Sequence, residues 1–237
     1  MPPRSKYVPP AHYERSTLSD VLPLVGRPPL EEFQTSWIAE GQSKSDTHLF
    51  YAGDLSLLRQ SVAVVGARDV TDEGAKRARR IARELSEAGL TIVSGLAKGV
   101  DVNAHRAALA AGGRTVAVIG TPIDQAYPAE HGPLQEEIAR DHLLVSPFPD
   151  GQKVWPSNFP KRNRVMAALT LGTIIIEASD SSGTLHQAVE CEKLGRWLFI
   201  LKSVYDTPGL EWPKRYARYN RVQVVTSAED VLGALAL

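Results

Sequence analysis

The chain has 237 residues, 43% of them hydrophobic, which allows one α/β domain with a sizeable core and an extension. Its 27 lysines and arginines balance its 27 aspartates and glutamates, so the overall charge predicts no polyanionic partner and any basic surface must be local. One cysteine excludes an internal disulfide framework, and the absence of a roughly 20-residue apolar run or a signal-peptide segment predicts a soluble, cytoplasmic protein with no membrane partner.

The first part of the chain, residues 1–45, is rich in proline, serine and charged residues and has only short apolar pieces. Such a composition predicts a flexible N-terminal extension that contains short helical or loop segments. We expect the compact domain to cover residues 46–237.

Within this domain, apolar runs alternate with helical patterns. Strands are predicted at 62–65, 91–93, 115–119, 143–145, 173–177, 197–201 and 222–225, and helices at 71–88, 102–111, 134–139, 164–171, 185–194 and 228–235. The first helix is the clearest, because Thr71 is a suitable N-cap and Gly89 a suitable end, with small and apolar residues at three- and four-residue spacing between them. Apolar strands without alternation, joined by helices, indicate an α/β fold: a Rossmann-like three-layer sandwich with a mostly parallel sheet.

Two turns that follow neighbouring strands have the character of phosphate-binding turns. Gly66 and Arg68 close the first strand, and Ser94, Gly95 and Lys98 follow the second. Glycine allows close backbone approach and a helix N-terminus attracts anions, so these turns predict a nucleotide or nucleic-acid ligand at the carboxyl edge of the sheet. For Gly66 to Arg68 the alternative is a tight turn between strand and helix with a solvent-facing arginine. The G-x-G-x-x-G spacing fails after Gly66, which argues against a nicotinamide or flavin cofactor, and we expect no cofactor.

A basic cluster and a third turn complete the candidate DNA- or phosphate-binding residues. The cluster is Lys161, Arg162, Asn163 and Arg164, directly after Phe159-Pro160, and it suits a groove for single-stranded nucleic acid; a proline-marked helix start with solvated charges is the alternative. The third turn, Ser182-Gly183-Thr184, opens the helix after an apolar strand, and a structural N-cap is the alternative reading there.

Signals for catalysis are weak. Asp101 and His105 share a helix face, but a capping aspartate and a packed histidine explain them better than an acid/base pair. No metal-ligand spacing and no nucleophile elbow occur, and Cys191 falls inside a predicted helix. We therefore predict no catalytic residue and no metal.

The order of these motifs resembles the DNA-processing protein A family, also called Smf. The matching residues are Phe50-Tyr51-Ala52-Gly53-Asp54-Leu55, Gly66-Ala67-Arg68, the stretch from Ser94 to His105, Tyr127-Pro128, Phe159 to Arg164, Glu177-Ala178 and Ser182-Gly183-Thr184. The resemblance covers about residues 48–201.

The resemblance implies an extended Rossmann fold that binds single-stranded DNA without catalysis, forms a homodimer and loads the RecA recombinase during natural transformation. Carried onto this chain, it implies DNA contacts by Arg68, by the Ser94-Gly95 turn and by the cluster at 161–164.

The alternative is a nucleotide-binding sensor, or a LOG-like phosphoribohydrolase that cleaves nucleoside monophosphates. The segment Gly183 to Gln187 resembles the LOG motif locally, but Gln187 stands where that motif has its catalytic glutamate. A neutral amide cannot serve as that general acid or base, so hydrolysis ranks below binding. His186 and Glu190 are the groups that a sensor would use.

Overall fold

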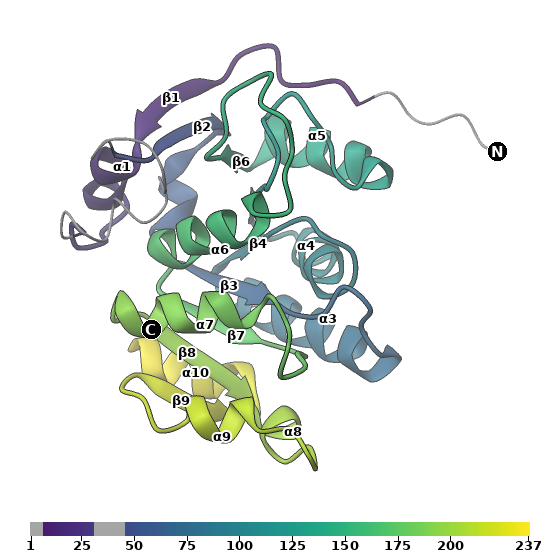
Figure 1. Ribbon diagram of the computed structural model, residues 1–237, viewed down its shortest axis with the longest axis vertical. Coiled ribbons are helices and arrows are strands. Elements are labelled where there is room, and N and C mark those ends of the chain that lie inside the picture. Colours follow the sequence, from purple (N-terminus) through teal and green to yellow (C-terminus); the bar gives the residue numbers. More distant parts are fainter. Residues whose placement is uncertain (1–6, 31–45) are drawn as a thin grey trace.

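The strands form one sheet, in the order β1-β2-β6-β5-β4-β3-β7-β8-β9, in a computed structural model that describes residues 7–30 and 46–237 (Figure 1). Their bounds are Glu14–Thr17 (β1), His48–Gly53 (β2), Ser61–Val65 (β3), Thr91–Ser94 (β4), Thr115–Val118 (β5), Leu143–Ser146 (β6), Gly172–Ile175 (β7), Trp197–Leu201 (β8) and Val222–Val225 (β9). From β3 to β9 every pairing is parallel, whereas β1 pairs with β2 and β2 with β6 in antiparallel fashion.

The helices follow the strands in the expected alternation. The bounds are Leu18–Leu24 (α1), Asp72–Glu87 (α3), Val100–Ala110 (α4), Gly132–Asp141 (α5), Asn158–Leu169 (α6), Leu185–Lys193 (α7), Lys202–Tyr205 (α8), Trp212–Tyr216 (α9) and Ala228–Leu235 (α10), with short 3₁₀ turns at Leu55–Leu58 and Ala129–His131. The predicted α/β fold with a mostly parallel sheet is confirmed. In the parts of the chain that the structure describes, no helix has the length and apolar character needed to cross a bilayer.

The chain runs outward from the centre of the sheet in two directions. From β3 it proceeds through β4 and β5 to β6, and then it crosses to β7 on the other side of β3 and continues to β8 and β9. Because parallel β-α-β connections are right-handed, this reversal puts α3, α4 and α5 on one face and α6 and α7 on the other. Figure 1 shows α6 and α7 side by side across β3 and β7. The reversal point between β3 and β7 is where such sheets form a ligand crevice.

The N-terminal region differs from the expected flexible extension within its described part, residues 7–30. Glu14–Thr17 pairs with β2 at the edge of the sheet, and α1 buries Leu18, Val21 and Leu22 completely in the main core. The sequence of β1, Glu-Arg-Ser-Thr, carries no apolar pattern, so this strand is stabilised by backbone pairing and leaves no periodicity signal. Residues 31–45 lie outside the described part of the chain, and the boundary at residue 46 stays a prediction.

Helix α6 begins earlier than predicted, at Asn158 instead of residue 164. Pro160 had marked the boundary, but it lies in the first turn, where backbone amides have no partner within the helix and proline is tolerated. The basic cluster at 161–164 is therefore helical.

A buried histidine fixes α4 to the sheet. His105 is fully buried, and its Nδ1 lies 2.7 Å from Thr115 Oγ1, which itself donates to the Ile92 carbonyl at 2.7 Å. The threonine hydroxyl is thus the acceptor, and the histidine is neutral with its proton on Nδ1. Burial lowers the pKa of His105 to about 3. The packed histidine that the sequence favoured is what the structure contains, and it holds the helix whose first turn reaches the candidate site.

His105 should make stability depend on pH. Its pKa falls from 6.5 in the unfolded chain to about 3 in the folded chain, so the unfolded state binds more protons between these values and acid weakens the fold. Between pH 7 and pH 5 the free energy of unfolding should fall by about 2 kcal/mol from this residue alone. Urea unfolding of His105→Gln should lack this component. The exposed control His12→Gln should retain it, and equal pH dependence in wild type and His105→Gln would contradict the assignment.

The buried face of α1 should contribute to global stability. Leu22 is fully buried in the main core, whereas Leu24 on the same helix is 58% exposed. Leu22→Ala should lower the free energy of unfolding by about 2–5 kcal/mol through lost packing and the cavity left behind. Leu24→Ala should change it by less than about 0.5 kcal/mol. Denaturant titration measures both, and an unchanged midpoint for Leu22→Ala would mean that the N-terminal region is an independent extension.

Candidate functional site

A cavity of about 260 Å³ lies at the reversal point of the sheet, beside the carboxyl end of β3. We call it the switch-point pocket. Its walls come from four segments: the turn Gly66-Ala67-Arg68, the start of α4 with Ala97 and Asp101, the first turns of α6, and the loop Ser182-Gly183-Thr184 before α7. These segments are far apart in sequence, and they meet because the carboxyl ends of neighbouring parallel strands share one edge of the sheet.

The turn after β3 is held in place by the backbone of Glu177, just beyond β7. Ala67 donates its amide to the Glu177 carbonyl at 2.8 Å, and that carbonyl oxygen would be 2.8 Å from a Cβ added at Gly66. Glycine at position 66 is thus required by the packing of two loops. The expected close approach of a ligand is not needed to explain it.

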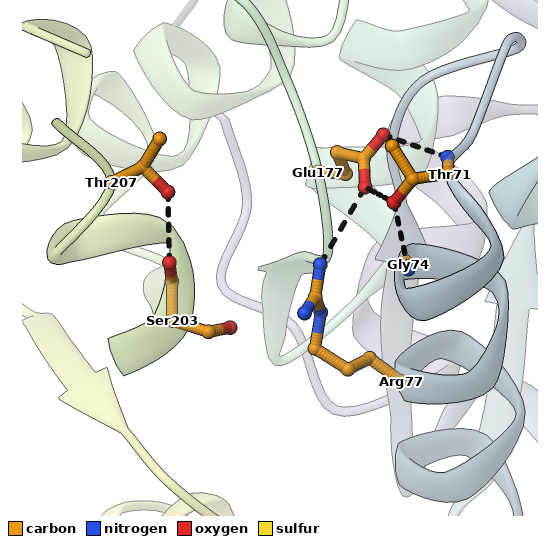
Figure 2. A network of polar contacts seen from close by, with 6 residues as sticks. All are labelled: Thr71, Gly74, Arg77, Glu177, Ser203 and Thr207. Atoms are coloured by element: carbon orange, nitrogen blue, oxygen red, sulfur yellow. Dashed lines mark hydrogen bonds and ion pairs between the residues drawn. The ribbon is translucent and has the colours of Figure 1, made fainter. Parts of the chain in front are cut away.

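The side chain of Glu177 fastens the start of α3 to the same point (Figure 2). Its carboxylate accepts from the amide of Thr71 at 3.0 Å and from the Thr71 hydroxyl at 2.6 Å, and Arg77 Nη2 lies 3.6 Å away. The Thr71 hydroxyl also accepts from the amide of Gly74 at 3.0 Å, which confirms the predicted N-cap. The loop between β3 and α3, which carries Arg68, is therefore anchored at both ends.

Arg162 forms the floor of the switch-point pocket. It is only 4% exposed, and its Nη1 donates to the Val118 carbonyl at the end of β5 at 2.8 Å. A Cβ added at Gly95 would lie 1.6 Å from that Nη1, so glycine at this position makes room for the guanidinium. Burial lowers the pKa of Arg162, while the neighbouring Asp101 raises it. A buried guanidinium stays charged at neutral pH, so the floor of the pocket holds a cation next to the Asp101 carboxylate.

The donors of the second turn are already committed inside the protein. The Ser94 hydroxyl donates to the Val64 carbonyl at 2.7 Å, and the Gly95 amide donates to the Asp101 carboxylate at 3.1 Å, as does the Ala97 amide at 3.3 Å. Ser94 is fully buried and lines neither the switch-point pocket nor the smaller cavity beside it, which is described below. Burial raises the pKa of Asp101. The carboxylate holds the turn before α4, whereas the N-cap position of the helix is Gly99, without a side-chain cap, so the helix-capping aspartate expected from the sequence is not what the structure contains.

Arg68 and two aromatic rings form the rim. The Arg68 guanidinium lies 4.9 Å from the centre of the Phe159 ring, and the Tyr127 ring lies 5.6 Å from Phe159. A smaller adjoining cavity of about 60 Å³ is lined by these three residues together with Gly95 and Lys98. Arg68 is exposed and makes no ion pair with any residue in 7–30 or 46–237, whereas Lys98 is 3.1 Å from Glu130. Arg68 is thus the cation at the rim that can meet an anion from solvent.

The helical phase of α6 divides the basic cluster. Phe159, Arg162 and Asn163 line the switch-point pocket, but Lys161 and Arg164 do not. Residues in a helix are about 100° apart, so four consecutive positions cannot share one face. Arg164 instead lies 3.6 Å from the buried carboxylate of Glu190 on α7. Of the predicted cluster, the structure therefore brings Arg162 and Asn163 to the pocket.

The third predicted turn lies where it was expected. Ser182, Gly183 and Thr184 line the pocket opposite α6, and the Thr184 hydroxyl donates to the Gly66 carbonyl at 3.3 Å. A Cβ added at Gly183 would meet nothing within 4 Å, and its φ is not in the left-handed region. Neither packing nor backbone conformation requires glycine here, unlike at Gly66 and Gly95.

The residues that the LOG-like alternative needs lie away from the pocket. Gln187 is fully buried and donates from Nε2 to Thr173 Oγ1 at 2.9 Å, and Glu190 is 3% exposed. His186 is exposed at the surface of α7. In the described ranges, 7–30 and 46–237, no group of three His, Cys, Asp or Glu residues could hold a metal ion.

Sequence reasoning left Phe159 and Tyr127 out of the predicted contact residues. A signal existed for both, because each belongs to a motif of the resemblance and each precedes a proline. A Cβ at Gly120, after β5, would lie 2.7 Å from the Phe159 ring, so a second glycine makes room for α6.

Comparison with known proteins identifies the family. The family model described as DNA recombination-mediator protein A matches residues 36–236. The chain is 42% identical over 186 residues to the DNA processing protein DprA of Streptococcus pneumoniae, covering 78% of this chain and 65% of the relative. The chain spans between 44% and 65% of the length of the curated relatives that it matches.

Two solved structures share the fold at useful identity. The X-ray structure of DprA from Streptococcus pneumoniae gives a TM-score of 0.71 at 38% identity, covering 83% of this chain and 69% of that one. A structure of DNA processing protein A from Helicobacter pylori, described in terms of its single-stranded DNA binding mode, gives 0.71 at 25% identity and covers 95% and 97% of the two chains. The resemblance drawn from the motifs is confirmed, and this chain belongs to the DNA recombination-mediator protein A family.

Proposed function

We propose that this chain binds single-stranded DNA at the switch-point pocket. The observation that carries the proposal is that one cavity is lined by an exposed cation, Arg68, and a buried cation, Arg162, together with the Phe159 ring and the ends of parallel strands. Arg68 forms no ion pair with a residue that the structure describes. Positive charge beside stacking surfaces is what single-stranded nucleic acid requires. The Helicobacter pylori relative, described as binding single-stranded DNA, supports this assignment.

A backbone phosphate would lie between the Gly66-Ala67-Arg68 turn and Gly183. Arg68 supplies a bidentate charged contact, Arg162 supplies a buried guanidinium at the floor, and the open space at Gly183 lets phosphate oxygens approach the backbone. The side chain of Asn163, which lines the same wall, adds a hydrogen-bonding group for a phosphate or a base.

A base next to that phosphate would stack at the rim. Tyr127 is 52% exposed, and its ring lies beside Phe159. Stacking of a base on an aromatic ring contributes about 1–3 kcal/mol and tolerates any base, so binding would be weakly selective for sequence.

We infer binding without catalysis at this site. The titratable groups near the pocket make hydrogen bonds that stabilise the fold. Asp101 accepts hydrogen bonds from two backbone amides, and the buried, neutral His105 is hydrogen-bonded to Thr115. Gln187 faces Thr173, which removes the remaining support for a LOG-like hydrolase. A nucleotide sensor remains the competing function, because a cavity of about 260 Å³ lined by two arginines also suits one mononucleotide.

The wider role belongs to the same proposal. The family name, recombination mediator, supports a contact with the RecA recombinase and action on DNA taken up during transformation, in the cytoplasm. We also propose that the protein works as a homodimer, since dimers are the commonest soluble assemblies and would offer one strand two pockets.

Charge reversal at the rim should abolish most of the DNA affinity. Arg68→Glu should weaken binding of a fluorescent oligothymidylate at least tenfold, because a phosphate contact becomes a repulsion, while the melting temperature stays unchanged since the side chain is exposed. In wild type, the affinity should fall as salt rises, and Arg68→Ala should reduce the slope of log affinity against log salt concentration by about 0.7 per lost phosphate contact.

The matched control is Arg106→Glu on the exposed surface of α4. Equal affinity of Arg68→Glu and the control would refute the assignment, and ready displacement of the oligonucleotide by AMP would favour the sensor.

Charge reversal at Arg162 is not a usable test of DNA binding. The guanidinium is buried on a backbone carbonyl, and a carboxylate in its place would lie beside Asp101. Two buried carboxylates without a cation are expected to unfold the domain.

A small side chain at Gly183 should block the DNA without harming the fold. Gly183→Val places two methyl groups in space that is open in this structure, so oligothymidylate affinity should fall at least tenfold and the melting temperature should change little. The matched control is Gly233→Val, because a Cβ added at Gly233 also meets nothing within 4 Å. Gly209→Val is unsuitable as a control, because the backbone of Gly209 has a φ of +77° and a valine there would be strained. Undiminished binding by Gly183→Val would mean that the strand does not approach this wall.

A further inference from the structure

A second basic cavity lies at the opposite edge of the sheet, at the start of β7, β8 and β9. Its volume is about 480 Å³, and Arg27, Arg196 and Arg221 line it together with Trp197 and apolar side chains. We call these three residues the arginine triad. The switch-point pocket lies at the other ends of these parallel strands, so the two cavities are separate.

The arginine triad has no acidic partner among the residues that the structure describes, 7–30 and 46–237. Within these ranges no aspartate or glutamate lines the cavity, and none of the three arginines forms an ion pair. Arg27 and Arg196 are 5% and 7% exposed, and the Nε atom of each is buried without an acceptor. Buried charges are normally paired, so an unpaired group of this kind needs an explanation.

The three charges act on one another. Burial and the charge of Arg196 lower the pKa of Arg27 to about 10, and burial, with a smaller contribution from Arg221, lowers the pKa of Arg196. Each guanidinium carries one positive charge, so the cavity gathers three positive charges in a chain whose formal net charge is zero.

Helix ends account for only part of this arrangement. Arg27 donates to the carbonyls of Val25 and Leu58, Arg196 to that of Ala168, and Arg221 to that of Gly195. These carbonyls lie at the carboxyl ends of helices, which attract cations. Each helix end carries roughly half a negative charge, so the ends of α1, α6 and α7 offset about half of the positive charge.

We propose that the arginine triad is a binding site for a phosphate group, carried by a small phosphorylated molecule of nucleotide size. Guanidinium groups bind phosphate bidentately, and the triad supplies three of them around one cavity. The cavity volume is in the range of small-molecule sites, and the half-buried Trp197 ring offers a flat apolar wall. Arg221 is the exposed member, so it would meet the ligand first.

The test uses the full chain with inorganic phosphate and AMP as probes, at constant ionic strength set with chloride. Isothermal titration should show binding to wild type that weakens at least tenfold in Arg221→Gln and in Arg196→Gln. The matched control Arg218→Gln, an exposed arginine outside the cavity, should bind as wild type does. Arg196→Gln can destabilise the fold because the residue is buried, so Arg221→Gln carries the decision.

Two further measurements separate this site from the switch-point pocket. Phosphate binding should persist in Arg68→Glu, and oligothymidylate binding should persist in Arg221→Gln. If phosphate binding disappears in Arg68→Glu, or if no variant of the triad changes it, the probe binds elsewhere and the proposal fails. If Arg221→Gln loses oligothymidylate binding, the triad belongs to the path of the DNA and the proposal of a separate small-molecule site fails as well.

Discussion

The candidate site depends on how one buried charge, the guanidinium of Arg162, is accommodated at the carboxyl edge of the sheet. It lies against the end of β4 because Gly95 has no side chain, it donates to the last carbonyl of β5, and it is balanced by Asp101 at the start of α4. Asp101 in turn accepts the amides that shape the turn before α4. A charge this costly to bury therefore fixes the relative positions of two helices and two strands, and the pocket is the space left between them.

The two arginines of the pocket differ in exposure and therefore in role. Arg162 is buried and donates to the Val118 carbonyl, so its guanidinium stays at the floor of the cavity beside Asp101. Arg68 is exposed, rests on the Phe159 ring, and stays free of carboxylates in the described ranges. A fixed charge inside a concave, low-dielectric wall attracts anions more strongly than the same charge on an open surface. This explains how a chain with a formal net charge of zero presents a local site for a polyanion.

Much of the fold was predictable because buried parallel strands leave an unbroken apolar signature, as Val62 to Val65 and Thr173 to Ile175 do. The polar edge strand β1 leaves none, since its stability comes from backbone pairing with β2. Turn chemistry pointed to Arg68 and Gly183, which both line the pocket. It could not show that the Ser94 hydroxyl and the Gly95 amide donate to other groups of the protein, because those acceptors are set by the fold. Nor could it show that Gly95 must be glycine, because the side chain that needs the space is that of Arg162, far along the chain. The phase of α6, which separates Arg162 from Lys161, depended on where that helix begins, and Pro160 concealed its start.

The reversal of the chain between β6 and β7 has a consequence for cooperativity. The strands before the crossing, β3 to β6, and those after it, β7 to β9, contact each other in the sheet through the pairing of β3 with β7. The pocket draws Arg68 and Asp101 from the first group and Gly183 from the second, with α6 from the crossing itself. A ligand in this pocket would therefore contact both groups of strands and link them. Since binding stabilises only the state in which both halves are folded, occupancy would couple their unfolding and make the sheet open as one unit.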